Sequence, residues 1–135
     1  MYVFKTSGNT FNSVIYNQKH AFKTLPQDWH IDEIVLVSKN KSDCNNGEKQ
    51  IQYTMKLVDI QPIKPGEADG FWPGNEGRWN YLVICKDTKP LVRPFNLDDI
   101  LGEDSRSYRT VMTFKKIDPD HKISIDNYLQ KSEAR

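Results

Sequence analysis

The residues with the clearest chemical potential are two aromatic side chains in a loop-forming stretch. Residues 62–77 contain three prolines and four glycines around Phe71 and Trp72. Glycine and proline favour irregular surface segments, where few neighbours can cover a large ring. A ring left uncovered can stack on a planar ligand such as a nucleobase, with a gain of roughly 1–3 kcal/mol per base. We therefore expect Trp72 and Phe71, with Trp29 as a further candidate, to form the walls of a ligand site.

Polar side chains lie at the end of the first expected strand. Lys5, Thr6 and Ser7 lead towards the start of a helix, where hydroxyl, ammonium and backbone N–H groups can face a base edge or a phosphate. Turn capping is an equally good explanation of Thr6 and Ser7. The remaining candidates are Asn12, Lys39 and Asn40 for polar edges or the backbone of a ligand, and Lys19, Lys23 and Lys41 for phosphates.

No catalytic constellation is evident. His20, His30 and His121 are far apart in the sequence, and none lies in a metal or nucleophile motif. The glycines of residues 62–77 match no phosphate-binding loop. We therefore expect a binding module without metal or cofactor. A site assembled from distant residues, for instance Lys5, His20 and Asp32, stays open as an alternative.

The composition is that of one globular domain. The chain has 135 residues, 37% hydrophobic and 27% charged, with a formal net charge of +1. A net charge near zero argues against binding of nucleic acid through the charge of the whole molecule, so any phosphate contacts must be local. Residues 1–27 have three lysines and no acidic residue, although a solvated basic face is an even alternative. Neither a secretory signal nor a membrane-spanning run is evident, which predicts a cytoplasmic protein with both cysteines reduced.

Hydrophobic patterning predicts short strands joined by loops, with a few short helices. The expected strands are 2–6, 31–38, 51–60, 79–86 and 106–117, with an extended connection over 89–94. The expected helices begin at Thr10 or Asn12 and run to residues 17–22, cover 97–101 between Asn96 and Gly102, and cover 123–129. The loops are too short for regular crossover helices, so a mainly antiparallel, strongly bent sheet is favoured.

Three stretches in this order resemble EVE domains and the related YTH domains of the PUA-like superfamily. They are Tyr2-Val3-Phe4-Lys5-Thr6-Ser7, then residues 33–40 with 50–59, and finally Phe71-Trp72-Pro73 followed by Gly77-Arg78-Trp79. The resemblance covers about residues 1–117. It implies an α+β fold, a PUA-like bent, mixed or antiparallel β-barrel flanked by short helices. It also implies one domain over residues 1–129, with a charged tail over 130–135.

The same resemblance implies a nucleic-acid-binding function. Its pocket would accept a modified base, most often a methylated one, flipped from DNA or held in RNA, as in restriction or defence systems where a partner protein supplies catalysis. Two alternatives remain at the level of sequence. One is an enzyme that processes RNA or nucleotides, and the other is a protein-interaction module anchored by Phe71 and Trp72.

Overall fold

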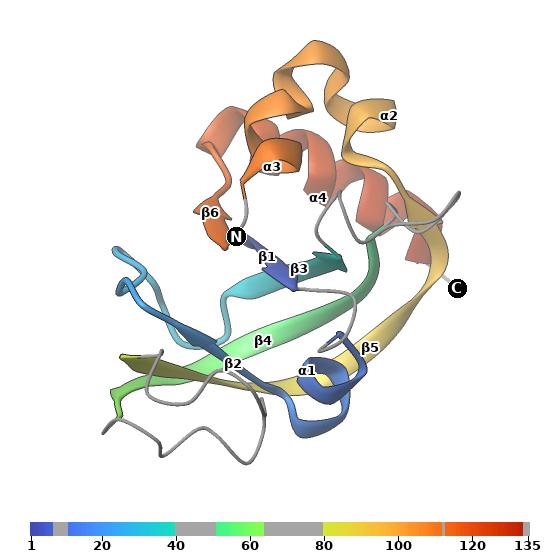
Figure 1. Cartoon of the computed structure of the whole chain (residues 1–135). Helices are drawn as coiled ribbons and strands as arrows, with labels where there is room; N and C mark the ends of the chain where they lie inside the picture. The colour runs from blue at the N-terminus through green and yellow to red at the C-terminus, as the bar shows by residue number, and fades with distance from the viewer. Residues whose placement is uncertain (7–10, 40–50, 64–79, 112, 134–135) are drawn as a thin grey trace.

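A six-stranded sheet that curls into an open barrel dominates the computed structural model of the chain (Figure 1). The structure describes residues 1–6, 11–39, 51–63, 80–111 and 113–133. The strands are β1 (Tyr2–Thr6), β2 (Lys19–Phe22), β3 (Ile34–Lys39), β4 (Ile51–Pro62), β5 (Tyr81–Phe95) and β6 (Phe114–Lys116). The helices are α1 (Phe11–Asn17), α2 (Leu97–Leu101), the 3-10 turn η2 (Gly102–Ser105), α3 (Arg106–Thr110) and α4 (Pro119–Glu133).

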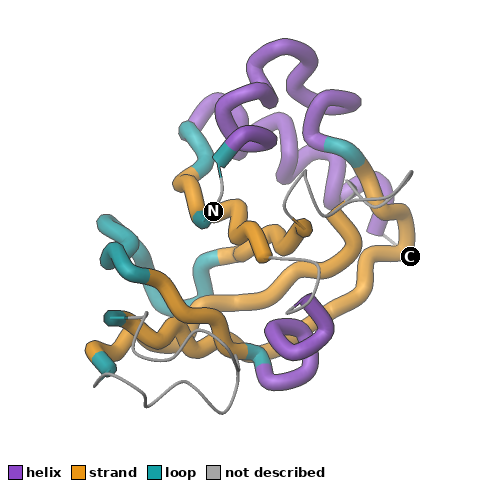
Figure 2. Tube along the Cα trace, in the orientation of Figure 1, coloured by secondary structure: helices purple, strands orange, loops and turns teal. Residues whose placement is uncertain are grey.

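The strand order is β2-β5-β4-β3-β1-β6. Among the described strands only β1 and β3 run parallel, and the other neighbouring strands are antiparallel. Helices α2, α3 and α4 gather on one side of the sheet, and α1 lies on the other (Figure 2). The expected α+β class and strongly bent, mainly antiparallel barrel with flanking helices are therefore confirmed.

Strand β1 separates two hydrophobic cores, because successive side chains of a strand point to opposite faces. Tyr2 and Phe4 face the interior of the curl, where they pack with Val35 and Val37 of β3. Val3 faces the helices α2 to α4, which we call the helical lobe together with η2. All five residues of β1 are buried, as expected for a strand covered on both faces.

Helix α1 ends earlier than the sequence predicts. Gln18 adopts a left-handed backbone conformation with φ of 56°, which stops the helix after Asn17. Residues 19–22 then form β2 and pair antiparallel with β5, from Lys19↔Ile84 to Phe22↔Tyr81. The expected continuation of the helix to Phe22 was wrong, since strand pairing buries His20, Ala21 and Phe22 in the curl.

The predicted last strand was also wrong in its first half. Residues 106–110 form helix α3, and only 114–116 pair with β1. Tyr108 drives this change because its ring is fully buried in the helical lobe. Its hydroxyl group lies 2.7 Å from His121 Nδ1 and accepts a hydrogen bond from the Asp118 N–H. The Tyr108 side chain therefore packs in the helical lobe, and its residue is not part of the sheet.

Two other elements are longer than expected. Strand β5 is continuous through residues 89–94, which the sequence assigned to a connection. Helix α2 has the predicted bounds. Helix α4 begins at Pro119, a residue well suited to the first helical position, and continues to Glu133. Within the described ranges, no helix has the length and apolar character needed to cross a membrane.

Side chains seal the outer edge of β5. Beyond Ile84 the described register pairs β5 with β4 alone. The Thr88 N–H donates to Gln18 Oε1 at 3.0 Å, and the Val92 N–H donates to Glu133 Oε1 at 2.7 Å. Pro90 and Pro94, which alternate with them, have no N–H group. This edge therefore offers little to a foreign strand.

We expect Glu133→Ala to promote self-association, because it frees the Val92 N–H on an exposed edge. The free energy of unfolding should fall by about 1 kcal/mol. Urea denaturation and analytical ultracentrifugation measure the two effects. Lys131→Ala is the matched control, since Lys131 is exposed near the end of the same helix. Equal behaviour of both variants would show that Glu133 does not protect the edge.

Candidate functional site

Two parallel strands end side by side at the candidate site. The register pairs Lys5 of β1 with Ser38 of β3, which places their α-carbons about 4.8 Å apart. The side chains of Lys5, Thr6 and Ser38 are all buried, with exposed fractions of 7%, 1% and 1%. In open α/β sheets, ligands bind outside the carboxyl ends of parallel strands. We call these three residues the strand-end site.

The three side chains leave the sheet on different faces. Thr6 follows the parity of Tyr2 and Phe4 and faces the interior of the curl. Lys5 follows Val3 and faces the helical lobe, as does Ser38, its register partner. A ligand would have to lie over the strand ends, rather than on one face of the sheet, to meet all three residues.

Two hydroxyl groups of this site lack a hydrogen-bond partner among the described residues. They are Thr6 Oγ1 and Ser38 Oγ, each with almost no exposed surface. Burying a polar group without a partner costs roughly 1–3 kcal/mol. Most buried polar groups in folded proteins are paired, so two such hydroxyls on adjacent strand ends mark a place where a ligand could supply the missing partners.

His20 borders the site from β2. Its Nδ1 accepts a hydrogen bond from the Ala21 N–H at 2.8 Å, and its Nε2 lies 2.8 Å from the carbonyl oxygen of Lys5. Because Nδ1 accepts, the proton of the neutral ring is on Nε2, which donates to Lys5. Burial lowers the pKa of His20 from 6.5 to about 4, although the hydrogen bond from Nε2 to the Lys5 carbonyl opposes this shift. The ring is therefore neutral near pH 7.

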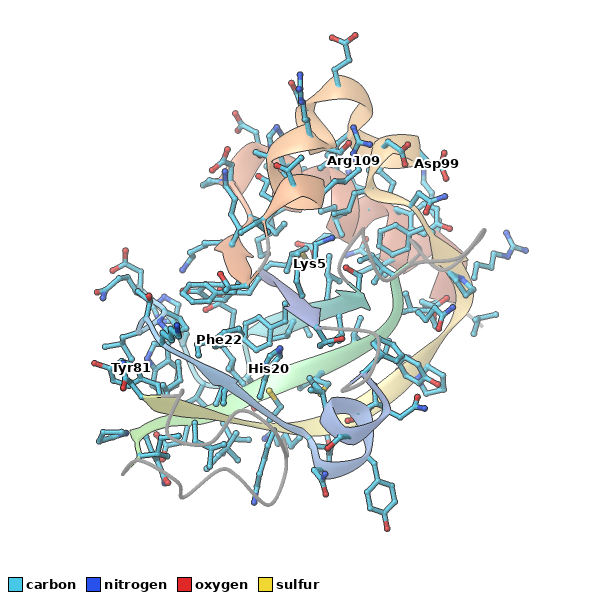
Figure 3. All side chains as sticks on the ribbon, in the orientation of Figure 1. Lys5, His20, Phe22, Tyr81, Asp99 and Arg109 are labelled. Carbon is cyan, nitrogen blue, oxygen red and sulfur yellow. The ribbon has the colours of Figure 1, made fainter. Side chains whose placement is uncertain are left out.

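Aromatic rings fix the orientation of the His20 imidazole. Phe22 stacks on it with a centroid distance of 4.4 Å, and Phe4 meets it edge-on at 6.0 Å. Figure 3 shows His20 and Phe22 on β2 within the curl, with Lys5 on β1. Polar and aromatic surfaces are thus adjacent near the end of β1.

Trp29 lies away from the strand-end site. Its loop is held at the start of β1, where the Tyr2 hydroxyl donates to the carbonyl of Gln27. Lys116 of β6 donates to the carbonyl of Asp28 in the same loop. The indole is half-buried and packs against the interior core. The structure therefore does not bring Trp29 together with Lys5 and Thr6.

The other candidates are distributed as follows. Asn12 is exposed on α1, the Lys19 side chain is half-buried on β2, and Lys23 is exposed just after β2. The backbone of Lys39 ends β3. Ser7, Asn40, Lys41, Phe71 and Trp72 lie outside the described residues. Asn80 is described, and its N–H donates to the Phe22 carbonyl while its side-chain amide donates to the Lys23 carbonyl.

The structure does not bring together Lys5, His20 and Asp32, the site of distant residues that the sequence left open as an alternative. His20 does contact Lys5, but Asp32 forms an exposed ion pair with Lys86 at 2.7 Å.

Sequence reasoning missed Ser38 as a site residue. A usable signal existed, because Ser38 follows the apolar run 34–37 just as Lys5 and Thr6 follow the apolar run 2–4.

Comparisons with known proteins identify the fold but no family. No family model and no curated protein sequence matches the chain. Among solved structures, a point variant of the ASCH protein from Zymomonas mobilis aligns with a TM-score of 0.65 and 10% identity, over 94% of each chain. The unsubstituted ASCH protein aligns with a TM-score of 0.59, also at 10% identity, over 93% of each chain.

A third solved structure agrees with the first two. The NMR structure of a Rhodopseudomonas palustris protein aligns with a TM-score of 0.58 and 12% identity, over 98% of this chain and 92% of that one. ASCH domains have the PUA-like fold, so the PUA-like barrel expected from the sequence is confirmed. At identities this low, the likeness concerns the fold.

Proposed function

We propose that this protein is a nucleic-acid-binding domain that receives a single base at the strand-end site. The observation that carries the proposal is that the buried hydroxyls of Thr6 and Ser38, beside the buried Lys5, have no hydrogen-bond partner in the described part of the chain. The PUA-like fold, shared with ASCH domains, supports nucleic-acid binding in general, with RNA as the first candidate.

The chemistry of the site suits a base edge. A base presents carbonyl and ring-nitrogen acceptors as well as amino donors on its Watson–Crick edge. The Lys5 ammonium group donates, whereas each hydroxyl group can both donate and accept. Since these groups are buried, a base must leave its stack to meet them. Single-stranded segments permit this most easily, because their bases are already unstacked.

The finer part of the proposal is that the base is methylated. It rests on the resemblance of three stretches to EVE and YTH domains and on the aromatic residues Phe71 and Trp72. A ring that covers a base also covers its methyl group. Burying one such group contributes about 0.8 kcal/mol, which corresponds to roughly fourfold in affinity.

Binding of short labelled oligonucleotides tests the proposal. Fluorescence anisotropy should be measured with single-stranded RNA and DNA of one sequence, each unmodified, with N6-methyladenine or with 5-methylcytosine. We expect binding to at least one strand and at least roughly fourfold preference for its methylated form. Equal binding of methylated and unmodified strands removes the finer part, and no binding to any strand removes the proposal.

The affinity should depend weakly on salt, since the net charge is only +1. Two or three phosphate contacts on a single strand give a slope of roughly −1.5 to −2 in log affinity against log salt concentration. Lys23→Ala should make the slope shallower, whereas Lys122→Ala, on the helical lobe, should not. A slope much steeper than this would indicate an extended phosphate-binding surface instead of a local site.

A further inference from the structure

The two ends of the curled sheet meet without a shared ladder of backbone hydrogen bonds. Strand β2 is at one end of the strand order, and β1 is next to the other end. The Ala21 N–H of β2 donates to its neighbour's ring nitrogen, His20 Nδ1. On the opposite side of that ring, Nε2–H donates to the Lys5 carbonyl of β1. One imidazole therefore connects a backbone donor of β2 to a backbone acceptor of β1.

The end of β1 needs this connection because its other partner strand stops there. Strand β6 pairs with Tyr2, Val3 and Phe4, and the Lys5 N–H still donates to the Thr113 carbonyl at 2.7 Å. In a strand, the N–H and C=O of one residue point towards the same edge. The Lys5 carbonyl therefore points to the β6 side of β1, just past the last residue that β6 pairs with. The His20 N–H donates the hydrogen bond that this carbonyl accepts.

We propose that His20 is a positioning residue of the strand-end site, which it orients by holding the backbone between Lys5 and Thr6. This inference rests on the proposed function and assigns to His20 a role that acts through the main chain, without contact to the ligand. The ring is suited to the task because it is 8% exposed and stacked on Phe22, so its two nitrogens are held in fixed directions.

The positioning role differs from general support of the core. Met55 of β4 is fully buried in the same interior core, and its thioether has no proton to donate to β1. Met55→Val is therefore the matched variant, because it weakens the same core and leaves in place both the link to Lys5 and the stacking of Phe22 on the ring. His20→Leu removes the link, and His20→Gln retains an amide that can donate to the Lys5 carbonyl and accept from the Ala21 N–H.

The experiment measures oligonucleotide affinity and amide hydrogen exchange for the three variants. We expect His20→Leu to lower the affinity about tenfold, because a displaced strand end misplaces Lys5 and Thr6 together. His20→Gln should recover most of this loss, and Met55→Val should stay within about threefold of the unsubstituted protein. In the unliganded protein, the Ala21 amide should exchange faster in His20→Leu only.

Each contrary result has a distinct meaning. Affinity lost equally in His20→Leu and Met55→Val, or unchanged in His20→Leu, overturns the positioning role. Unchanged exchange at Ala21 in His20→Leu overturns the link itself. If the unsubstituted protein binds no oligonucleotide, the proposed function fails and the positioning role fails with it, whereas faster exchange with full affinity removes the positioning role alone.

Discussion

Replacing Thr6 by valine is expected to lower the affinity for the ligand about tenfold without loss of stability. The Thr6 hydroxyl is buried and has no hydrogen-bond partner among the described residues, so valine removes a costly group of nearly the same shape. The free energy of unfolding should stay the same or rise by up to roughly 1 kcal/mol. Ser38→Ala should act in the same direction, and the double variant should lose roughly 100-fold in affinity.

Ser105→Ala is the matched control for both substitutions. Ser105 is also a buried hydroxyl residue, but its Oγ donates to the Gly102 carbonyl and accepts from Arg109 Nε. This variant should lose roughly 1–3 kcal/mol of stability and keep its affinity, because it lies in the helical lobe. Urea denaturation and oligonucleotide binding separate the two outcomes. Thr6→Val would contradict the account if it destabilised the protein as much as Ser105→Ala and bound normally.

Acid should destabilise the protein through His20. The folded ring binds a proton only below its pKa of about 4, whereas the unfolded chain binds one below about 6.5. Between these values the unfolded state holds more protons, so the free energy of unfolding falls as the pH falls. The contribution of the neutral His20 ring to the free energy of unfolding is complete above about pH 6.5. Roughly 2–3 kcal/mol of this contribution should be lost between about pH 7 and pH 4.5.

His20→Gln isolates this effect from that of the carboxylates. Glu33 also has a lowered pKa, because hydrogen bonds from the Met1 amino group and the His30 N–H outweigh the opposing effect of burial. Its contribution is lost in acid in both proteins. The difference in pH dependence between the unsubstituted protein and His20→Gln therefore reports His20. Parallel curves for the two proteins would mean that the ring is not buried in its neutral form.

Residue patterns predicted the parts of the fold that local chemistry determines. The alternation and β-branching of 2–6, 31–38 and 51–60 predicted three strands, and strands formed over 2–6, 34–39 and 51–62. Asn96 and Gly102 predicted the bounds of α2, because glycine is favoured just after a helix, and Gly102 has a positive φ of 60° that glycine adopts readily. The bent, mainly antiparallel sheet followed from loops too short for crossover helices.

The errors occurred where tertiary packing overrides local preference. The apolar spacing of 11–22 suits a helix, but pairing of residues 19–22 with β5 decided their conformation. Tyr108 has high strand propensity, yet its burial among the lobe helices placed it in α3. Neither the partner strand nor the lobe is visible in the local sequence.

The candidate site was only partly predictable. A polar pair after an apolar strand identified Lys5 and Thr6, but the parallel neighbour that supplies Ser38 depends on the strand order. His20 could not be assigned from sequence, because its two backbone partners come from the curl that joins β2 to β1. Trp72 and Phe71, the leading aromatic candidates, lie outside the described residues and stay predictions.

The most direct test of a base at the end of β1 is an NMR titration that follows the threonine methyl groups. Thr6 reports the strand-end site, Thr54 and Thr88 report β4 and β5, and Thr110 reports the helical lobe. Adding the oligonucleotide that binds best should shift the Thr6 methyl signal strongly and leave Thr54, Thr88 and Thr110 nearly unchanged. Shifts at Thr54, Thr88 or Thr110 with an unmoved Thr6 signal would place the ligand elsewhere and contradict the account.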